Sequence, residues 1–217
     1  MANLVCFPHY TCGALICDIM MNKMSPMGKN GAIQNAEHGR GKILDTDSVS
    51  VITPQEFQNK IDRLKSIDKF TGWIGTHAWP GNLDLAEFEK VLLITTTTSR
   101  SKIYRWSRVY RHYFLPAWAN LTGQELIDKS RETAKNYTIP FEPVFSGNVI
   151  NLEFADVVDH TTEFTTLIKD QQYEESIKRW HQVNNFLYTA DFWNSDEVKF
   201  FYQAELEQNL QRYYIYN

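Results

Sequence analysis

Residues Val91 to Thr98 read Val-Leu-Leu-Ile-Thr-Thr-Thr-Thr, and this stretch decides the fold class. An unbroken run of apolar and β-branched residues predicts a strand that is buried on both faces of a sheet. Ser99 to Phe114 follows at once and predicts a helix. Its large apolar residues recur at helical spacing: Ile103, Trp106, Tyr110 and Phe114. A strand that leads directly into a helix is the unit from which parallel sheets are built.

The N-terminal part of the chain repeats this order. Asn3 to Phe7 predicts a short buried strand, which Pro8 ends. Gly13 to Asn22 then predicts a helix that is apolar on most sides. Residues 22–48 contain four glycines among Asn, Lys and Ser, and they predict a long loop.

A helix-start signal stands between this loop and the central strand. Thr53-Pro54-Gln55-Glu56 combines an N-cap, a proline at the first helical position and a glutamate at the third, which predicts a helix from Pro54 to Ile67. Gly72 to His77 predicts a second strand. Residues 85–90 predict a short helix or turn.

The C-terminal half is dominated by helical patterns. The expected helices cover residues 123–137, parts of 152–168, 170–188 and 195–213, and residues 144–151 are expected to form a strand or a loop. Strands that alternate with helices predict an α/β fold of three layers, with a mainly parallel sheet flanked by helices. We expect a single domain over residues 1–217, with residues 151–217 as its helical extension.

Composition narrows the class of protein. The 217 residues are 43% hydrophobic and carry a net charge of −4, which is typical of a globular protein and not of a disordered or fibrous one. The apolar stretch from Leu4 to Cys17 is shorter than the roughly 20 residues that span a bilayer. We therefore expect a cytoplasmic protein without a membrane segment. The cysteines lie at positions 6, 12 and 17, and no second Cys or His cluster has zinc-ligand spacing, so we expect reduced thiols and no metal site.

The charge is unevenly distributed. Residues 90–124 contain six basic residues and no Asp or Glu, whereas residues 151–217 contain 12 acids and 5 bases. A basic segment in an acidic protein favours a compact anionic ligand over a nucleic acid, which usually needs a broadly basic surface. A solvated helix face paired with the acidic tail is the alternative.

The first candidate site is the turn between the first strand and the first helix. Its residues are His9, Tyr10, Thr11, Cys12, Gly13 and Ala14. Backbone N–H groups at a helix start can bind a phosphate or sulfate group. The turn is not a Walker A loop, because its lysine is absent. An ordinary connection remains the alternative, and Cys12 is a weaker candidate nucleophile.

The second candidate is His77 in Gly75-Thr76-His77-Ala78-Trp79-Pro80. A histidine that leaves a strand lies where open α/β sheets bind their ligands, and its ordinary pKa suits general-base catalysis near neutral pH. A purely structural histidine is the alternative.

The third candidate follows the central strand. Arg100, Ser101, Arg105 and Arg108 combine a hydroxyl with guanidinium groups that can hold a phosphate. Ser99 or Ser101 can instead serve only as a helix cap.

The order of these three candidates resembles the sulfotransferase family, which has a P-loop nucleotide hydrolase-like fold. The resemblance covers about residues 3–114. It implies that residues 9–14 bind the 5'-phosphosulfate of 3'-phosphoadenosine 5'-phosphosulfate and that His77 is the catalytic base. It also implies that Arg100 and Ser101, with Arg105 or Arg108, hold the 3'-phosphate. The acceptor would be a carbohydrate or a small alcohol, and four tryptophans are candidates for stacking on it: Trp73, Trp79, Trp106 and Trp118.

The sequence departs from the family pattern at two of these positions. Gly13 is the only glycine of the first loop, which has no lysine, and Gly75 stands where the family has a lysine before Thr-His. Two alternatives therefore remain. One is a P-loop-type nucleotide kinase or hydrolase, and the other is a non-catalytic binding protein that retains the fold. The oligomeric state is not indicated by the sequence.

Overall fold

The computed structural model describes residues 1–8, 10–11, 13–21, 53–138, 140–159, 162–168, 173–196 and 198–204. The chain divides into two compact units. The first unit comprises Met1–Thr95 and Phe141–Val183, and the second comprises Thr96–Pro140 and Asn184–Asn217. The loop predicted over residues 22–48 lies outside the described residues, and the single domain expected for the whole chain stays a prediction.

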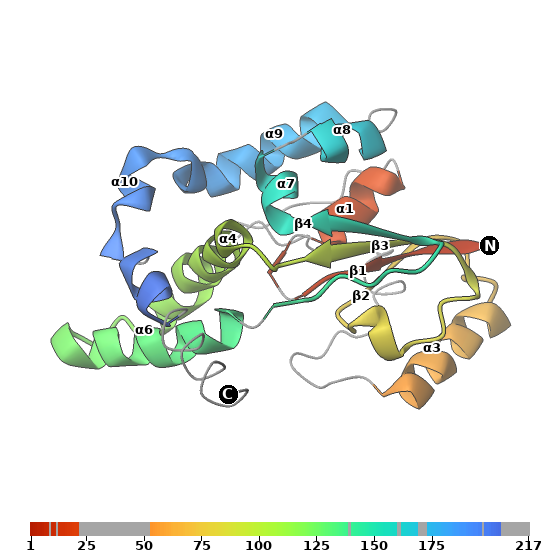
Figure 1. Ribbon diagram of the computed structural model, residues 1–217, viewed down its shortest axis with the longest axis horizontal. Coiled ribbons are helices and arrows are strands. Elements are labelled where there is room, and N and C mark those ends of the chain that lie inside the picture. Colours follow the sequence, from red (N-terminus) through yellow and green to blue (C-terminus); the bar gives the residue numbers. More distant parts are fainter. Residues whose placement is uncertain are drawn as a thin grey trace. The chain divides into compact units, whose positions relative to one another are not determined.

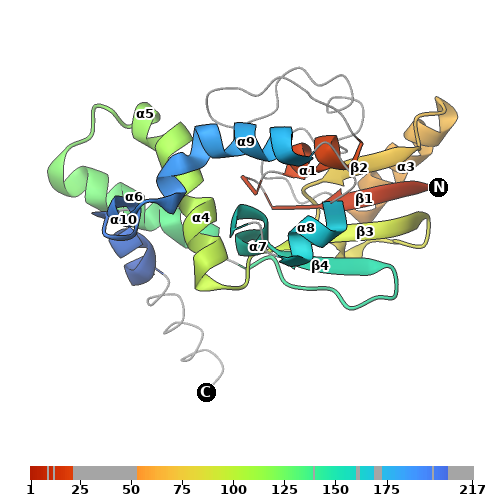
Figure 2. The same ribbon diagram turned by 90° about the horizontal axis from the view of Figure 1, so that it is seen from above.

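The first unit is built around a parallel sheet. Its strands are β1 (Ala2–Cys6), β2 (Gly72–Thr76), β3 (Phe88–Thr95) and β4 (Val149–Glu153). All three pairings are parallel, and the strands lie side by side in the order β2-β1-β3-β4, as Figure 2 shows. The predicted α/β class and parallel sheet are confirmed.

Helices cover both faces of this sheet. The helices of this part of the chain are α1 (Gly13–Met20), α3 (Pro54–Ser66), the 3-10 helix η1 (Pro80–Asn82), α7 (Phe154–Asp159), α8 (Thr162–Ile168) and α9 (Tyr173–Asn184), whose last residue belongs to the second unit. Figure 1 shows α3 on one face and α1 with α7 on the other. The arrangement has three layers, because buried parallel strands need cover on both sides.

The helix α3 begins as its sequence predicts. The Thr53 side chain accepts a hydrogen bond from the backbone N–H of Glu56, and the Glu56 carboxylate accepts one from the N–H of Thr53. These reciprocal bonds pair N–H groups that a helix start otherwise leaves without partners. They also hold the pKa of Glu56 below its ordinary value, through the backbone bond first and the side-chain bond second.

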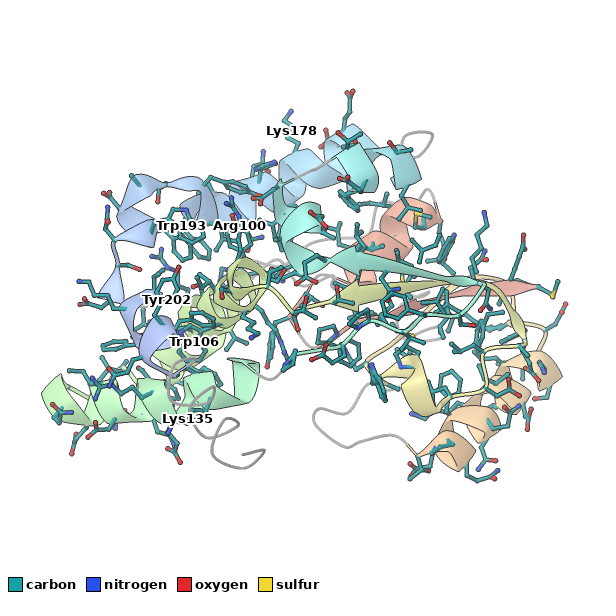
Figure 3. The ribbon with its side chains drawn as sticks, viewed as in Figure 1. Arg100, Trp106, Lys135, Lys178, Trp193 and Tyr202 are labelled. Carbon is teal, nitrogen blue, oxygen red and sulfur yellow. The ribbon has the colours of Figure 1, made fainter. Side chains whose placement is uncertain are left out.

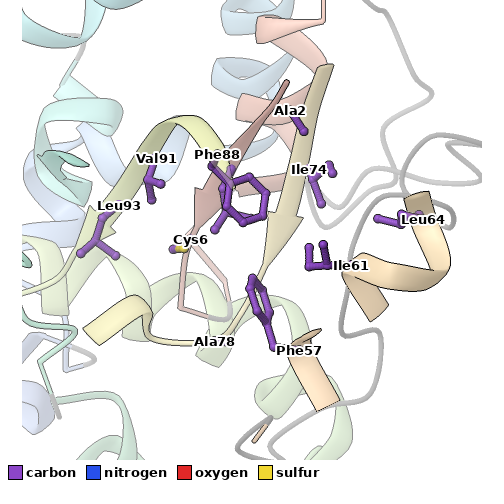
Figure 4. Close-up of a cluster of buried hydrophobic side chains, with 11 residues drawn as sticks. Ala2, Cys6, Phe57, Ile61, Leu64, Ile74, Ala78, Phe88, Val91 and Leu93 are labelled. Atoms are coloured by element: carbon purple, nitrogen blue, oxygen red, sulfur yellow. The ribbon is translucent and has the colours of Figure 1, made fainter. Parts of the chain in front are cut away.

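One hydrophobic cluster joins α3 to the sheet. The helix contributes Phe57, Ile61 and Leu64, which pack with the side chains of one sheet face (Figure 4). The strands contribute Ala2, Leu4, Cys6, Ile74, Phe88, Val91 and Leu93. Residues two apart on a strand share a face, so this cluster is the product of the strand periodicity. It packs α3 against β1, β2 and β3, and the first two candidate sites follow the ends of β1 and β2.

The second unit is helical where it is described. Its elements are α4 (Ser99–Val109), the π-helix η2 (Tyr110–Phe114), α5 (Leu115–Ala117), α6 (Gly123–Thr138), the 3-10 helix η3 (Asn185–Tyr188), α10 (Ala190–Trp193) and a helical segment over 198–204. Ile103, Trp106 and Tyr110 are buried, as their spacing predicts. The same helix also buries Ser101, Lys102 and Arg108. Its polar face is therefore not the solvated face that charge patterning offered as an alternative.

Both predicted boundaries of β3 are wrong, and the strand ends at Thr95 and not at Thr98. Phe88 to Lys90 belongs to β3, not to a helix or turn. The pairing of β1 with β3 shifts by one residue between Ala2 and Leu4, so the exposed Glu89 and Lys90 lie in an irregular stretch of the strand. Such a β-bulge interrupts the apolar run that marks a buried strand. The predicted helix over residues 99–114 is confirmed, but its last turn widens to a π-helix at Tyr110.

Candidate functional site

The carboxyl ends of β1 and β2 meet at one edge of the sheet and bring the first two candidates together. The Phe7 N–H donates to the Thr76 carbonyl at 2.9 Å, which extends the strand pairing by one residue. His77 then lies beside Phe7, with its Nδ1 atom 3.0 Å from the Phe7 carbonyl oxygen. The two rings meet edge to face with centroids 4.5 Å apart. The side chain of His77 is thus oriented by the residue that opens the first loop.

This hydrogen bond determines which nitrogen of His77 carries the proton. A carbonyl oxygen only accepts, so the bond requires a proton on Nδ1. In the neutral ring the lone pair then lies on Nε2, which is the arrangement that a general base needs. The Phe7 carbonyl, directly after β1, holds the His77 ring in one tautomer. In a Ser-His-Asp triad a carboxylate holds the histidine in this way.

The described part of the first loop is a tight turn. The N–H of Thr11 donates to the Pro8 carbonyl at 3.3 Å, and its hydroxyl donates to the same oxygen at 2.7 Å. Tyr10 has a φ of 71°, which is the left-handed conformation that a type II turn requires at its third residue. Thr11 is fully buried. The N–H and the hydroxyl of Thr11 therefore both stabilise the turn by donating to the Pro8 carbonyl.

Gly13 is required by packing. A β-carbon at this position would overlap the ring of Phe7. The first turn of α1 can approach β1 only because residue 13 has no side chain. Gly13 begins α1, and the first N–H groups of a helix have no partner inside it. N–H groups of this kind can bind an anion.

Acidic residues follow β4 in the same unit. The Thr95 hydroxyl, at the end of β3, donates to the carboxylate of Glu153, at the end of β4. Burial raises the pKa of Asp156 above its ordinary value, and the nearby Glu163 and Glu153 carboxylates raise it further. The carboxylates around β4 therefore disfavour an anionic ligand at that strand end.

The third candidate set lies on α4 in the second unit. Its cap is Thr98, whose hydroxyl accepts from the N–H of Ser101 at 3.2 Å, and neither Ser99 nor Ser101 takes that part. Arg100 is exposed, and its Nε donates to the Tyr104 hydroxyl at 3.0 Å. Figure 3 shows Arg100 beside Trp193 of α10, and the guanidinium carbon lies 5.3 Å from a Trp193 ring centroid. Arg105 is partly exposed, whereas Ser101 is fully buried.

Arg108 belongs to a buried polar cluster that sequence reasoning missed. Only 6% of Arg108 is exposed, and its Nε donates to the Asn184 side-chain oxygen at 3.0 Å. His112 is hydrogen-bonded to the same Asn184 side chain. Arg111, next to it on the π-helix, lies over the ring of Phe186 at 4.3 Å. The spacing of Arg108 and His112 on one helix face was visible in the sequence, but nothing there pointed to Asn184.

His112 lies in an environment that disfavours its charged form. Burial holds the pKa of His112 below its ordinary value of 6.5, and the positive charges of Arg108 and Arg111 act in the same direction. The hydrogen bond with Asn184 opposes them. These surroundings favour the neutral form of His112, and Arg108 and Arg111 carry the positive charge of the cluster.

Three candidate residues of the first loop are not described in full by the structure. His9 and Cys12 lie outside the described residues, and so does the side chain of Ala14. Among the residues that the structure describes, no group of three or more His, Cys, Asp or Glu side chains is placed to hold a metal ion. None of the helices formed by those residues is long and apolar enough to cross a membrane.

Comparison of the chain with protein-family models, with curated proteins and with solved structures finds no match in any of the three.

Proposed function

We propose that this protein transfers a sulfuryl group from 3'-phosphoadenosine 5'-phosphosulfate to a hydroxyl group, with His77 as the general base. The observation that carries the proposal is the hydrogen bond between His77 Nδ1 and the Phe7 carbonyl. It joins the loop that would bind the 5'-phosphosulfate to the residue that would accept the proton. The strand order supports the same assignment, because it reverses between β1 and β3 and ligands of open α/β sheets bind outside the strand ends near such a point.

The reaction needs one proton acceptor and one leaving group. Nε2 of His77 takes the proton of the acceptor hydroxyl, and the oxygen attacks sulfur. The bond from sulfur to the phosphate oxygen breaks, and 3'-phosphoadenosine 5'-phosphate leaves. Positive charge and N–H dipoles near the phosphates stabilise the charge that develops there. This chemistry needs no metal.

In the first unit the N–H groups at the start of α1 suit the 5'-phosphosulfate, together with His9, Tyr10 and Cys12. Within the second unit, Arg100 and Arg105 are more accessible to a phosphate group than Arg108 and Ser101, because the latter two are buried. A P-loop-type fold and a helical C-terminal part of the domain are included in this proposal.

One observation favours the alternative of a binding protein without catalytic activity. The N–H and the hydroxyl of Thr11 both donate to the Pro8 carbonyl, and the described part of the loop contains no lysine. A loop of this kind offers less stabilisation to a transferring sulfuryl group than one with a lysine, since one key donor contributes roughly 3 kcal/mol elsewhere. Such a protein would bind the nucleotide and not turn it over.

Two measurements separate these functions. Thermal unfolding with adenosine 3',5'-bisphosphate, with ATP and magnesium, and without ligand reports which nucleotide the folded protein binds. Transfer of labelled sulfuryl to a panel of carbohydrates and phenols reports turnover. Sulfuryl transfer together with stabilisation by the bisphosphate alone supports the proposal. Stabilisation without transfer favours the binding protein, and stabilisation by ATP with magnesium favours the kinase or hydrolase.

His77 offers a matched pair of variants. The amide nitrogen of asparagine is as many bonds from Cα as Nδ1 is, so His77→Asn can still donate to the Phe7 carbonyl but cannot act as a base. We expect His77→Asn and His77→Ala both to lose transfer by about 100-fold or more, with bisphosphate affinity unchanged. We expect only His77→Ala to lower the unfolding temperature. Full activity in His77→Asn would show that the histidine is structural.

A further inference from the structure

Thr76 makes hydrogen bonds on both sides of its link to His77. It is the last residue of β2, and its carbonyl accepts from the Phe7 N–H at 2.9 Å. Its hydroxyl oxygen accepts from the Ala78 N–H at 3.1 Å. Serine and threonine hydroxyls bond to their own backbone in this way in turns. The second bond closes a turn over residues 76–78 with His77 in the middle, so it restrains the backbone of the histidine.

The Thr76 hydroxyl lies at a position that an apolar side chain could fill. Thr76 is 0% exposed, and it shares a strand face with Ile74, which belongs to the hydrophobic cluster that packs against α3. A buried hydroxyl is unfavourable unless it is hydrogen-bonded. Valine has the same shape as threonine and would place no polar group there. The bond to Ala78 is a role that valine could not take.

Two hydrogen bonds therefore restrain His77 at different points. The Thr76 hydroxyl holds the backbone of the turn, and the Phe7 carbonyl holds the ring, at 3.0 Å from Nδ1. Phe7 is itself bonded to Thr76 through its N–H, so the three residues form a closed set of hydrogen bonds. A ring that is held at both points keeps one tautomer and one direction of its Nε2 lone pair.

We infer that Thr76 is a positioning residue for His77, and that its hydroxyl keeps the ring on the Phe7 carbonyl with the proton on Nδ1. The inference rests on the proposed function of His77. Without the bond to Ala78, the backbone of residue 77 can turn and the ring can leave the carbonyl. A released ring can carry its proton on either nitrogen, and only the form with a lone pair on a correctly placed Nε2 acts as the base.

The tautomer of His77 tests this inference without any turnover. Long-range correlation of ring protons with ring nitrogens by NMR assigns the proton to Nδ1 or Nε2, at about pH 8.5, where an ordinary histidine is neutral. We expect the proton on Nδ1 in the parent and a mixture of tautomers in Thr76→Val. Thr76→Ser keeps the hydroxyl and should show the tautomer of the parent.

The same variants have an expected effect on sulfuryl transfer. Thr76→Val should lower kcat about 10-fold, because misplacement of a catalytic group by about 1 Å is costly. The KM for 3'-phosphoadenosine 5'-phosphosulfate should stay unchanged, because Thr76 is bonded to Phe7 through a backbone carbonyl that valine retains. Thr76→Ser should restore the kcat of the parent.

Thr95 supplies a matched control. It is a threonine at the end of β3 in the same unit, it is 4% exposed, and its hydroxyl donates to the Glu153 carboxylate. Thr95→Val should lower the unfolding temperature, since it removes a buried hydrogen bond, and should leave the tautomer of His77 unchanged.

Three outcomes would overturn the inference. They are the same tautomer in Thr76→Val as in the parent, a proton on Nε2 in the parent, and loss of the Nδ1 tautomer in Thr76→Ser. The second and third can be read even where Thr76→Val does not fold.

The inference and the proposed function fail in different ways. An Nδ1 tautomer that depends on Thr76, without sulfuryl transfer, would keep the positioning role and remove the enzyme. Sulfuryl transfer with the kcat of the parent in Thr76→Val would keep the enzyme and remove the positioning role.

Discussion

The two units hold His77 and His112 in contrasting ways. His77 lies at the end of a strand, and a neutral backbone carbonyl orients its ring. His112 lies on a π-helix, where burial and two arginines oppose its protonation. The first arrangement fixes a tautomer and suits proton transfer, whereas the second suppresses a charge and suits structure. A histidine near an arginine-rich segment is therefore the weaker candidate for catalysis in this chain, although its segment carries the stronger charge signal.

The largest loss of stability is expected from a substitution of Gly13. This substitution tests whether packing against Phe7 determines the shape of the loop after β1. Gly13→Ala places a β-carbon on the Phe7 ring and should destabilise the fold by about 3 kcal/mol. Urea unfolding measures the loss. Adding Phe7→Leu should recover part of it, because the two residues are in contact.

Gly147→Ala is the matched control for Gly13. A β-carbon at residue 147 meets nothing within 4 Å, so stability should stay within about 0.5 kcal/mol of the parent. If Gly13→Ala kept its stability and lost only the binding of adenosine 3',5'-bisphosphate, the glycine would serve the ligand and not the packing.

A smaller effect is expected at Arg108, which tests whether the second unit's cluster is structural. Arg108→Met removes the donor to the buried Asn184 side chain and should cost about 2 kcal/mol in urea unfolding. Arg100→Met, on the same helix but exposed, should cost less than about 1 kcal/mol. Equal losses in the two variants would argue against the structural role of the Arg108–Asn184 pair.

The smallest effect is a pH dependence from His112. Its pKa is lower in the folded than in the unfolded protein, so the unfolded state binds more protons below about pH 6.5. Stability from this group is complete above that pH and is lost as the pH falls toward the folded pKa. We expect His112→Gln to flatten the decline of the unfolding free energy measured from pH 7.5 to 5.

His181 provides the comparison for this measurement. Burial lowers the pKa of His181 as well. His181→Gln should therefore also reduce this decline, because burial lowers the pKa of both histidines. A decline as steep in His112→Gln as in the parent would contradict a lowered pKa of His112 in the folded protein.

The strands and helix start that the sequence predicts correctly are marked by patterns in their own residues. Apolar runs marked β1 and β2, and Thr53-Pro54-Gln55-Glu56 marked the start of α3 to the residue. The first residues of β3 were missed because Glu89 and Lys90 lie at a bulge, where two polar residues in succession interrupt the strand pattern. The π-helix at Tyr110 leaves no signal of its own, since one widened turn keeps the apolar spacing almost unchanged.

The sequence predicted which residues belong to the candidate site, but it did not predict which atoms they contact. Strand ends mark where side chains of an open sheet can meet, which is why Gly13 and His77 were singled out. The partner of His77 depends on the register of β1 against β2, in which Cys6 pairs with Thr76. No pattern in the sequence specifies that register.

The sequence by itself determined the α/β class, the parallel strands and the segments that carry polar chemistry, because these depend on periodicity and composition along the chain. Only the tertiary structure decided what each polar group does. It set the His77 ring on the Phe7 carbonyl, filled the space beside Gly13 with an aromatic ring and buried Arg108 against Asn184. The physical reason is that a hydrogen bond or a desolvation cost depends on which atoms approach one another, and that is settled by packing between segments far apart in the chain.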